Sequence, residues 1–436
     1  MERRHCVNKF ILETGWAVCS AADVRDEPTY FVVEDGIIQE IGSGTVSEPN
    51  GIPVIKRPNS VAMPGLVNTH GHAAMTLLRG AGDDLPLMQW LSEKVYPNEA
   101  KLNGEAVYWG TMLAALEMIM SGTTTFTDMY FFMHDAARAV EEAGLRGVLS
   151  WGMVGFSEAD REKGILQSTE FANRWNGAAN GRIRVTLGPH APYTCPPEYL
   201  TEIAELSTEL DVPVQIHLSE TKGEVEDSIK QFGYSPIANA QRTGLLDRPV
   251  LAAHCVHLSE ADIQILQQHR VRVAHNPQSN LKLGSGVAPV TKLLKAGVRV
   301  GLGTDGAASN NNLDMFEEMR LAATLHKGVL MDATAVTAPQ AFSMATEEGA
   351  KCAFLEEQHG TLTKGAQADI VLLSHDSPHF WPNHNLLSNI VYASGADDVT
   401  DVFVQGRQLL SNRVPQTIDV ERVQFEVGRI EQLLKS

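Results

Sequence analysis

The stretch GEAVYWGTMLAALEMIMSGTTTFTDM, residues 104–129, decides the fold because it places a helix directly before a strand. Residues 104–122 have the spacing of an amphipathic helix, and residues 123–129 form a short strand-like run that contains Asp128 near its end. A helix that leads straight into a short strand is the repeating unit of α/β folds. The same unit is therefore expected on both sides of this stretch.

The alternation continues in both directions along the chain, with helix-like segments such as PEYLTEIAELSTEL (197–210) between the strands. The candidate strands are residues 61–70, 123–129, 146–154, 184–191, 212–220, 250–257, 271–277 and 298–306. Eight strand–helix alternations over roughly 250–300 residues predict a (β/α)8 barrel of the TIM type rather than an open sheet. We place this barrel in residues 61–360.

Both ends of the chain have a different texture, made of short β-rich pieces. Residues 1–60 contain TYFVVEDGIIQEIG (29–42), where Asp35-Gly36 is a hairpin signal. Residues 361–436 contain ADIVLLS and DVFVQGRQLLS, with a turn glycine at Gly406, before a terminal helix. Two β-rich ends around a different centre predict one small β-sandwich domain assembled from both termini.

The composition excludes some partners and favours a cytoplasmic protein. The formal net charge of -18 argues against a nucleic-acid backbone or an anionic membrane as the main partner. The five cysteines are odd in number and show no CxxC spacing, which is typical of reduced thiols. No signal-peptide pattern and no apolar run of about 18 residues is visible. We expect a soluble, cytoplasmic chain, and either a homodimer or a homotetramer is compatible with the sequence.

Polar and ionisable residues collect where the candidate strands end, which is where barrel enzymes carry their active sites. A single histidine at a strand end is best explained by a structural or surface role. A whole set at one rim is different, because burying many ionisable groups together is costly unless a cation or mutual hydrogen bonds compensate. The set comprises His70, His72, Asp128, His190, His217, Glu220, His254, His275 and Asp305.

A divalent metal is the natural compensation, and imidazoles with one carboxylate suit zinc, with iron as a plausible substitute. His70 and His72 stand two positions apart, so in an extended strand both point the same way. His217 would be the third nitrogen ligand and Asp305 the carboxylate. Gly71 is either a small spacer between the two histidines or an ordinary turn glycine. The fourth strand has no lysine that could bridge two metals, which favours a single ion.

The remaining strand-end residues receive roles from their chemistry. Glu220 is close enough to His217 to reach a water activated by the metal and to move a proton. His254 would hold or polarise that water, and Asp305 would both bind the metal and accept the proton of the water. His190 is expected to meet the substrate. Asp128 either orients a ligand, caps a helix or contacts the substrate, and His275 is expected to organise a loop.

These residues and their surroundings resemble the amidohydrolase superfamily in its mononuclear branch. Within it, the chain is most similar to the 5-methylthioadenosine/S-adenosylhomocysteine deaminase family. The matching motifs span almost the whole chain, and their ordered combination is highly specific. They include PGLVNTHGHAAMTLLRGAGDDLPLMQWL, YPNE, SGTTTFTDMYFF, GPHAPYTC, HLSET, HNPQSNLKLGSG and GTDGAASNNNLDMFEEMR.

The resemblance implies a divalent metal on His70, His72, His217 and Asp305, and substrate contacts from Glu99, His190 and Glu220. By this analogy Glu99 would bind the ribose hydroxyls, whereas from the sequence alone it would be a solvated carboxylate. One position departs from the family pattern, because Trp151 stands where many members carry an arginine for the polar tail of the larger substrate. Trp151 therefore favours substrates with a short or apolar 5′ group, unless it only packs in the core.

We therefore predict hydrolytic deamination of adenosine-type nucleosides, in which oxygen replaces the 6-amino group and ammonia leaves. Expected substrates are 5′-methylthioadenosine, adenosine and 5′-deoxyadenosine, with S-adenosylhomocysteine less favoured. The first alternative is another amidohydrolase reaction on a related heterocycle, of the guanine or triazine type. The second is a catalytically inactive relative, although all four ligands, Glu220 and His254 are present.

Overall fold

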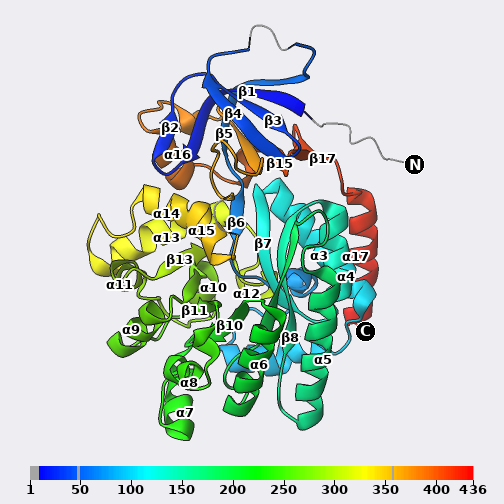
Figure 1. Ribbon diagram of the computed structural model, residues 1–436, viewed down its shortest axis with the longest axis vertical. Helices are drawn as coiled ribbons and strands as arrows, with labels where there is room; N and C mark the ends of the chain where they lie inside the picture. Colours follow the sequence, from blue (N-terminus) through cyan, green and yellow to red (C-terminus); the bar gives the residue numbers. More distant parts are fainter. Residues whose placement is uncertain (1–8, 47–49, 356–357, 436) are drawn as a thin grey trace.

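The computed structural model describes residues 9–46, 50–355 and 358–435, and it places a barrel beside a sheet built from both ends of the chain (Figure 1). The barrel is an eight-stranded parallel sheet in the order β13-β12-β11-β10-β9-β8-β7-β6. Its strands are β6 (Leu66–Asn68), β7 (Thr123–Tyr130), β8 (Arg146–Met153), β9 (Ile183–Pro189), β10 (Val214–Leu218), β11 (Val250–His254), β12 (Arg272–His275) and β13 (Arg299–Leu302).

The barrel closes through contacts just beyond the last strand pair. The backbone N–H and the hydroxyl of Thr69 both donate to the carbonyl of Leu302 at 2.8 Å, and the N–H of Asp305 donates to the carbonyl of His70 at 3.0 Å. The first and last strands are therefore neighbours, as a closed barrel requires. The expected fold class, a (β/α)8 barrel with a small β unit from both termini, is confirmed.

Helices surround the barrel and connect its strands. Capping residues mark where several of these helices begin. Asn103 caps the helix that begins at Gly104, and Ser157 and Asp160 form a capping box at the helix that begins at Glu158. The connecting helices are α3 (Gly104–Met120), α4 (Met133–Ala143), α5 (Glu158–Trp175), α6 (Pro197–Leu210), α7 (Lys222–Phe232), α8 (Pro236–Arg242), α9 (Glu260–Gln268), α11 (Val290–Lys295), α13 (Met315–Leu330), α14 (Ala338–Ala345) and α15 (Glu347–Cys352).

The terminal sheet has nine strands: eight follow one hydrogen-bonded path, β17-β16-β15-β14-β5-β1-β3-β4, and β2 pairs with β1 beside it. The expected hairpin at Asp35-Gly36 joins β3 to β4, and Gly406 lies in the turn between β15 and β16. The strands are β1 (Lys9–Ser20), β2 (Asp23–Arg25), β3 (Thr29–Glu34), β4 (Ile37–Ser43), β5 (Val54–Pro64), β14 (Ile370–Ser374), β15 (Val399–Val404), β16 (Arg407–Ser411) and β17 (Val414–Pro415).

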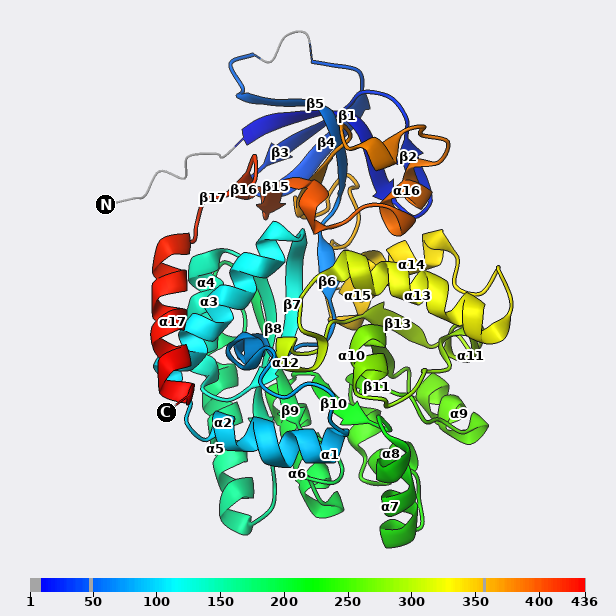
Figure 2. The same cartoon turned by 180° about the vertical axis from the view of Figure 1, so that it is seen from behind.

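The chain passes from the sheet to the barrel at Gly65. Strand β5 pairs with β1 and β14 up to Pro64, so the sheet extends past residue 60, and β6 begins in the barrel at Leu66. A Cβ on Gly65 would lie 2.0 Å from the Thr124 hydroxyl oxygen, so only glycine fits this close crossing. Beyond β14, α16 (Leu386–Tyr392) packs on α14, whereas the terminal α17 (Val420–Lys435) packs on α3 of the barrel (Figure 2).

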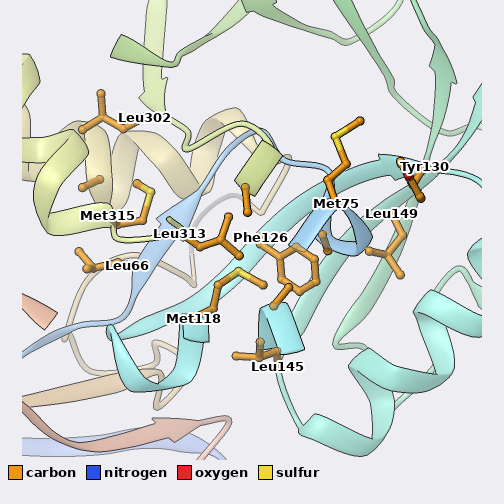
Figure 3. Close-up of a cluster of buried hydrophobic side chains, with 14 of the residues drawn as sticks. Leu66, Met75, Met118, Phe126, Tyr130, Leu145, Leu149, Leu302, Leu313 and Met315 are labelled. Carbon is orange, nitrogen blue, oxygen red and sulfur yellow. The ribbon is translucent and has the colours of Figure 1, made fainter. Parts of the chain in front are cut away.

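A continuous apolar core fills the space between the barrel strands and the helices. Figure 3 shows Phe126 of β7 among Met118, Leu145 and Leu149, all of which are buried. A second cluster, which includes Phe31 and Phe403, lies within the terminal sheet. In the residues that the structure describes, no helix is long and apolar enough to cross a membrane.

Short elements cover the carboxyl ends of the barrel strands. They follow β6, β12 and β13, and one group of them forms a nearly continuous helical segment from Leu87 to Glu99. These elements are η1 (Ala73–Leu78), α1 (Leu87–Trp90), η2 (Leu91–Val95), α2 (Tyr96–Glu99), α10 (Pro277–Lys282) and α12 (Ala307–Asn310). They enclose a cavity at this end of the barrel.

Candidate active site

The four expected metal ligands meet at the carboxyl ends of β6, β10 and β13. His217 lies within β10, and Asp305 follows β13. Strand β6 ends at Asn68, so His70 and His72 do not share a strand face; both lie in the irregular segment that leads into η1. Their convergence therefore comes from the loop path rather than from strand alternation.

The ligand atoms have the spacing of a tetrahedral ion. The Nε2 atom of His72 lies 3.3 Å from Nε2 of His217 and 3.3 Å from Oδ1 of Asp305, and Nε2 of His70 lies 3.4 Å from the same oxygen. A tetrahedral zinc with bonds of about 2.0–2.1 Å keeps its ligand atoms about 3.3 Å apart. Within the described chain, the buried Nε2 of His70 has no hydrogen-bond partner. The four side chains therefore fit a divalent cation.

Hydrogen bonds to the outer ring nitrogens aim two imidazoles at this point. Nδ1 of His72 donates to the carbonyl of Met129 at 2.7 Å, and Nδ1 of His217 donates to the carbonyl of His190 at 2.6 Å. A carbonyl can only accept, so in both rings the proton is on Nδ1 and Nε2 keeps its lone pair. Such bonds fix ring orientation in metal sites.

The carboxylate of Asp305 is held in the same way. Its Oδ2 accepts hydrogen bonds from Ser279 and Ser309, both at 2.7 Å, which leaves Oδ1 facing the histidines. The backbone of Asp305 is left-handed, with φ at 62°, as is that of His254 at 70°. Such conformations are unfavourable for residues other than glycine and cluster at functional sites.

Burial and neighbouring charges give His70, His217 and Asp305 the protonation states that metal ligands need. Burial lowers the pKa of His70 to about 4 and that of His217 well below its usual value, so both rings are neutral near pH 7. Burial would raise the pKa of Asp305, but its contacts with His70 and His72 outweigh that effect and hold the pKa well below its usual range. Neutral imidazoles and an ionised carboxylate are the forms that bind metals.

Glu220 and His254 form an acid–base pair next to the ligands. Oε2 of Glu220 lies 3.8 Å from Nε2 of His254, whose Nδ1 is 2.8 Å from Oδ1 of Asn280. Burial raises the pKa of the Glu220 carboxyl above its ordinary value, which favours its protonated form. Burial lowers the pKa of His254, but Glu220 and Asp305 outweigh this and raise it. The pair can hold and exchange a proton.

His190, Glu99 and Tyr130 line the same cavity. Nδ1 of His190 is 2.9 Å from the hydroxyl oxygen of Thr194, whose proton is directed to the carbonyl of Ala191 at 3.1 Å. His190 therefore donates from Nδ1, and its Nε2 is free to accept a hydrogen bond. Burial raises the pKa of Glu99 despite the lowering effect of the neighbouring Tyr130 hydroxyl. Glu99 thus lies in the pocket rather than on a solvated surface.

Two strand residues lie outside the cavity lining. Asp128 is fully buried, and its Oδ1 accepts a hydrogen bond from the backbone N–H of Ala73 at 2.8 Å, which fixes the start of η1 beside His72. This geometry favours a capping and orienting role. The ring of His275 faces His326, with their Nε2 atoms 3.2 Å apart, and does not line the cavity.

The structure does not bring Trp151 to the substrate cavity, contrary to the expected substrate contact. Its ring packs edge-on against His134 of α4 and Phe171 of α5, on the outside of β8. Its neighbour Gly152 lines the cavity instead, because alternate residues of a strand point to opposite faces. Trp151 is therefore a packing residue between barrel and helices.

The cavity has a volume of about 250 Å³, with the ligand cluster at its inner end. Several residues that line this cavity or orient the ligands were not predicted from the sequence. Ser279 and Ser309 orient Asp305, and Glu224 binds the backbone that carries Glu220. The only sequence signal for Ser309 is its position four residues after Asp305, one helical turn away.

A closed (β/α)8 barrel with histidines, an aspartate and a buried acid–base pair at its carboxyl rim defines the class of metal-dependent barrel hydrolases. Comparison with known proteins identifies the family. Residues 61–409 match the model of the Amidohydrolase family, so the chain belongs to that family. The expected superfamily resemblance is confirmed.

Close relatives and a solved structure agree with this membership. A 5-methylthioadenosine/S-adenosylhomocysteine deaminase of Desulforamulus reducens is 50% identical over 399 residues, which are 91% of this chain and 92% of the relative. A protein of the same name from Desulforudis audaxviator is 55% identical over 369 residues, 85% of this chain and 86% of the relative. The structure of an adenosine deaminase from Xanthomonas campestris with bound zinc has a TM-score of 0.92 at 36% identity, covering 98% of both chains.

Proposed function

We propose that this chain deaminates adenosine-type nucleosides, among them 5′-methylthioadenosine, to the inosine analogue and ammonia. The observation that carries the proposal is that the buried Glu220 and His254 lie 3.8 Å apart beside His70, His72, His217 and Asp305, whose ligand atoms are close enough to one another to suit a divalent ion. The names of the relatives at about half identity support the nucleoside class, and the zinc bound in the neighbouring deaminase structure supports zinc as the ion of this site.

In the proposed reaction each residue of the cavity has a separate role. The purine enters with its 6-amino group beside Glu220, which gives its proton to the adjacent ring nitrogen, where that proton stays in the inosine-type product. Glu220 then takes the second proton of the attacking water and gives it to the amine, which leaves as ammonia, and the first proton of the water restores Glu220 after turnover. His254 and Asp305 hold the attacking water and take up its proton. Glu99 accepts hydrogen bonds from the ribose hydroxyls, and Nε2 of His190 accepts one from the substrate. The bound divalent ion supplies Lewis-acid chemistry that lowers the pKa of water.

Replacing the acid tests the reaction. In Glu220→Gln the side chain keeps its size but cannot shuttle a proton, so kcat should fall by about 10²–10⁴-fold. The loss of adenosine absorbance in the ultraviolet measures turnover, while elemental analysis should find the same metal content as in the unchanged protein. Normal turnover by Glu220→Gln would disprove the assignment.

Metal and substrate identity need separate measurements. Purified protein should contain about one zinc per chain, and His217→Ala should lose it together with activity, since the variant lacks one of the three imidazole ligands. Product analysis separates an inosine-type product from the xanthine-type or hydroxytriazine products of the alternative reactions.

Light scattering tests the expected homodimer or homotetramer, and the cytoplasmic location stays a prediction.

A further inference from the structure

Four aromatic side chains, which we call the aromatic rim, form the outer wall of the cavity. They come from four separate segments: Tyr96 from α2, Phe131 from the residues after β7, Phe156 from the β8–α5 loop and Tyr193 from the β9–α6 loop. All four line the cavity and are also exposed to solvent, Phe156 by 72%. Exposed large apolar side chains that gather around one opening indicate a binding surface.

The wall between the aromatic rim and the ligand cluster is apolar as well. Leu87, Trp90, Leu91 and Val95 approach the cavity from the segment α1–η2, which lies across the barrel strands (Figure 2). Met75, Val154 and Leu283 complete this part of the lining. The route from the ligand cluster to solvent is therefore lined mainly by apolar side chains, which can neither pair with a charged substrate group nor form hydrogen bonds to it.

The charges that do reach the cavity are unsuited to an anion. Among the described residues that line it, none is lysine or arginine, whereas three are carboxylates: Glu99, Glu220 and Asp305. Two cations of the surrounding loops are already paired, Lys282 with Asp83 and Arg79 with Glu117. A substrate carboxylate would lose hydration without gaining a partner, which is unfavourable.

We infer that the aromatic rim is a subsite for uncharged apolar 5′ substituents, so that 5′-alkylthio- and 5′-arylthioadenosines are good substrates and nucleosides with an amino-acid tail are poor ones. The inference rests on the proposed function, because a purine held at Glu220 with its ribose at Glu99 directs the 5′ group outward. Phe156 and Tyr193 then stack on that group, as aromatic side chains do with thioethers and rings.

A substrate series combined with variants of Phe156 tests the subsite. The kcat/KM values are measured for adenosine, 5′-methylthio-, 5′-butylthio- and 5′-phenylthioadenosine and S-adenosylhomocysteine. We expect the butylthio and phenylthio compounds to equal or exceed the methylthio compound, and S-adenosylhomocysteine to be at least tenfold lower, a factor of the size that one side-chain contact supplies. Phe156→Ala should lower the phenylthio value by about tenfold.

Two further variants make the readout specific. Phe156→Arg supplies the missing cation, so it should raise the ratio of kcat/KM for S-adenosylhomocysteine to that for the phenylthio compound. Phe425→Ala removes a phenylalanine of similar exposure, 69%, from α17, and should change none of the values. Efficient use of S-adenosylhomocysteine, or equal behaviour of Phe156→Ala and Phe425→Ala, would overturn the inference while leaving deamination intact. Failure to turn over any of these nucleosides would instead reject the proposed function.

Discussion

Both carboxylate oxygens of Glu224 accept backbone N–H groups from the turn that carries Glu220. The N–H of Ser219 lies 3.0 Å from Oε1, and that of Glu220 lies 2.7 Å from Oε2. The backbone of Ser219 is left-handed, with φ at 54°, so the turn needs outside support. Glu224 is therefore a positioning residue that sets where the Glu220 side chain begins.

Glu224→Gln should lower kcat much more than it changes KM. An amide has only one oxygen, so its NH₂ group would face one of the two N–H donors and push the turn away. A displacement of about 1 Å at a catalytic group costs up to about 10²-fold in rate. Steady-state kinetics and metal analysis check this, with Glu226→Gln on the exposed face of α7 as control. Loss of metal in parallel with kcat would show a general structural role instead.

Two glycines near the ligands differ in what they tolerate. A Cβ on Gly71 would meet its nearest atom, the carbonyl oxygen of Thr127, at an ordinary 3.4 Å, so the space between His70 and His72 does not require glycine. A Cβ on Gly303 would lie 2.5 Å from Oδ1 of Asn276 and 2.8 Å from the backbone nitrogen of His70. Glycine is therefore required at Gly303, directly after β13, and not at Gly71 between the two histidines.

Gly303→Ala should therefore weaken metal binding and destabilise the protein, by about 1–3 kcal/mol for an overpacked core site. Gly71→Ala, the matched exchange directly between His70 and His72, should leave the zinc affinity and the melting temperature close to those of the unchanged protein. Titration with a competing chelator and thermal unfolding measure both quantities. A larger loss in Gly71→Ala than in Gly303→Ala would contradict the geometry.

The sequence identified residues whose type and strand-end position carry the chemistry, and it missed those that act through the backbone. His217 and Asp305 were predictable because imidazole and carboxylate at barrel strand ends are typical metal ligands. Glu224 was not, because its partners are N–H groups that every residue type possesses. Trp151 was misplaced because the inside or outside direction of one strand residue depends on register, which a single run does not fix.

At the level of elements, a buried acid of the long helix α13 binds the two short helices α10 and α12 beyond the barrel strands. Glu318 of α13 accepts a hydrogen bond from the side chain of Asn310 in α12 at 2.6 Å and one from the N–H of Gln278 in α10 at 3.2 Å. Helices α10 and α12 carry Ser279 and Ser309, which orient Asp305. The position of the carboxylate ligand thus depends on how these elements pack.

Burial raises the pKa of Glu318 from 4.5 to about 8, which gives the protein a specific pH dependence. The folded state holds this proton more tightly than the unfolded state, so its stabilising effect is complete below pH 4.5 and is lost as the pH rises through about 8. Glu318→Gln stays neutral and should lack this slope in urea unfolding experiments across the same pH range. Glu317→Gln, at the exposed neighbouring position, is the control and should keep the slope. If the free energy of unfolding of Glu318→Gln changed with pH in parallel with that of the unchanged protein, Glu318 would not be the source of the pH dependence.

The boundaries of elements were the least predictable feature of the fold. The run VAMPGLVNTH was expected to form one barrel strand, but Val61–Pro64 pairs in the terminal sheet and only Leu66–Asn68 joins the barrel. Both halves are apolar and buried, so composition cannot separate them. The division occurs at Gly65, where the chain passes within contact distance of Thr124, a partner that only the folded structure supplies.

Across the whole molecule, one buried ion pair connects the barrel to the terminal sheet. Arg146 at the start of β8 contacts Asp369 beside β14, with Nη2 3.1 Å and Nε 3.3 Å from Oδ2. Asp369 also accepts the N–H of Gln405 at 2.7 Å and, through its carbonyl, that of Gly65 at 3.0 Å. The β texture of both termini predicted that they form one unit, but not this pair, because its members are far apart in the sequence.

Asp369→Asn should destabilise the whole molecule without altering the chemistry. It leaves the Arg146 guanidinium buried without a counter-charge, and breaking a buried pair in this way costs about 3–5 kcal/mol. The pair lies at the amino end of β8, opposite the rim that holds the ligands, so zinc content and kcat at low temperature should be retained. Urea unfolding measures the loss, and Glu260→Gln, which breaks the exposed pair with Lys292, should cost at most about 1 kcal/mol. If Asp369→Asn were no more harmful than Glu260→Gln, the joint between sheet and barrel would rest on apolar packing alone.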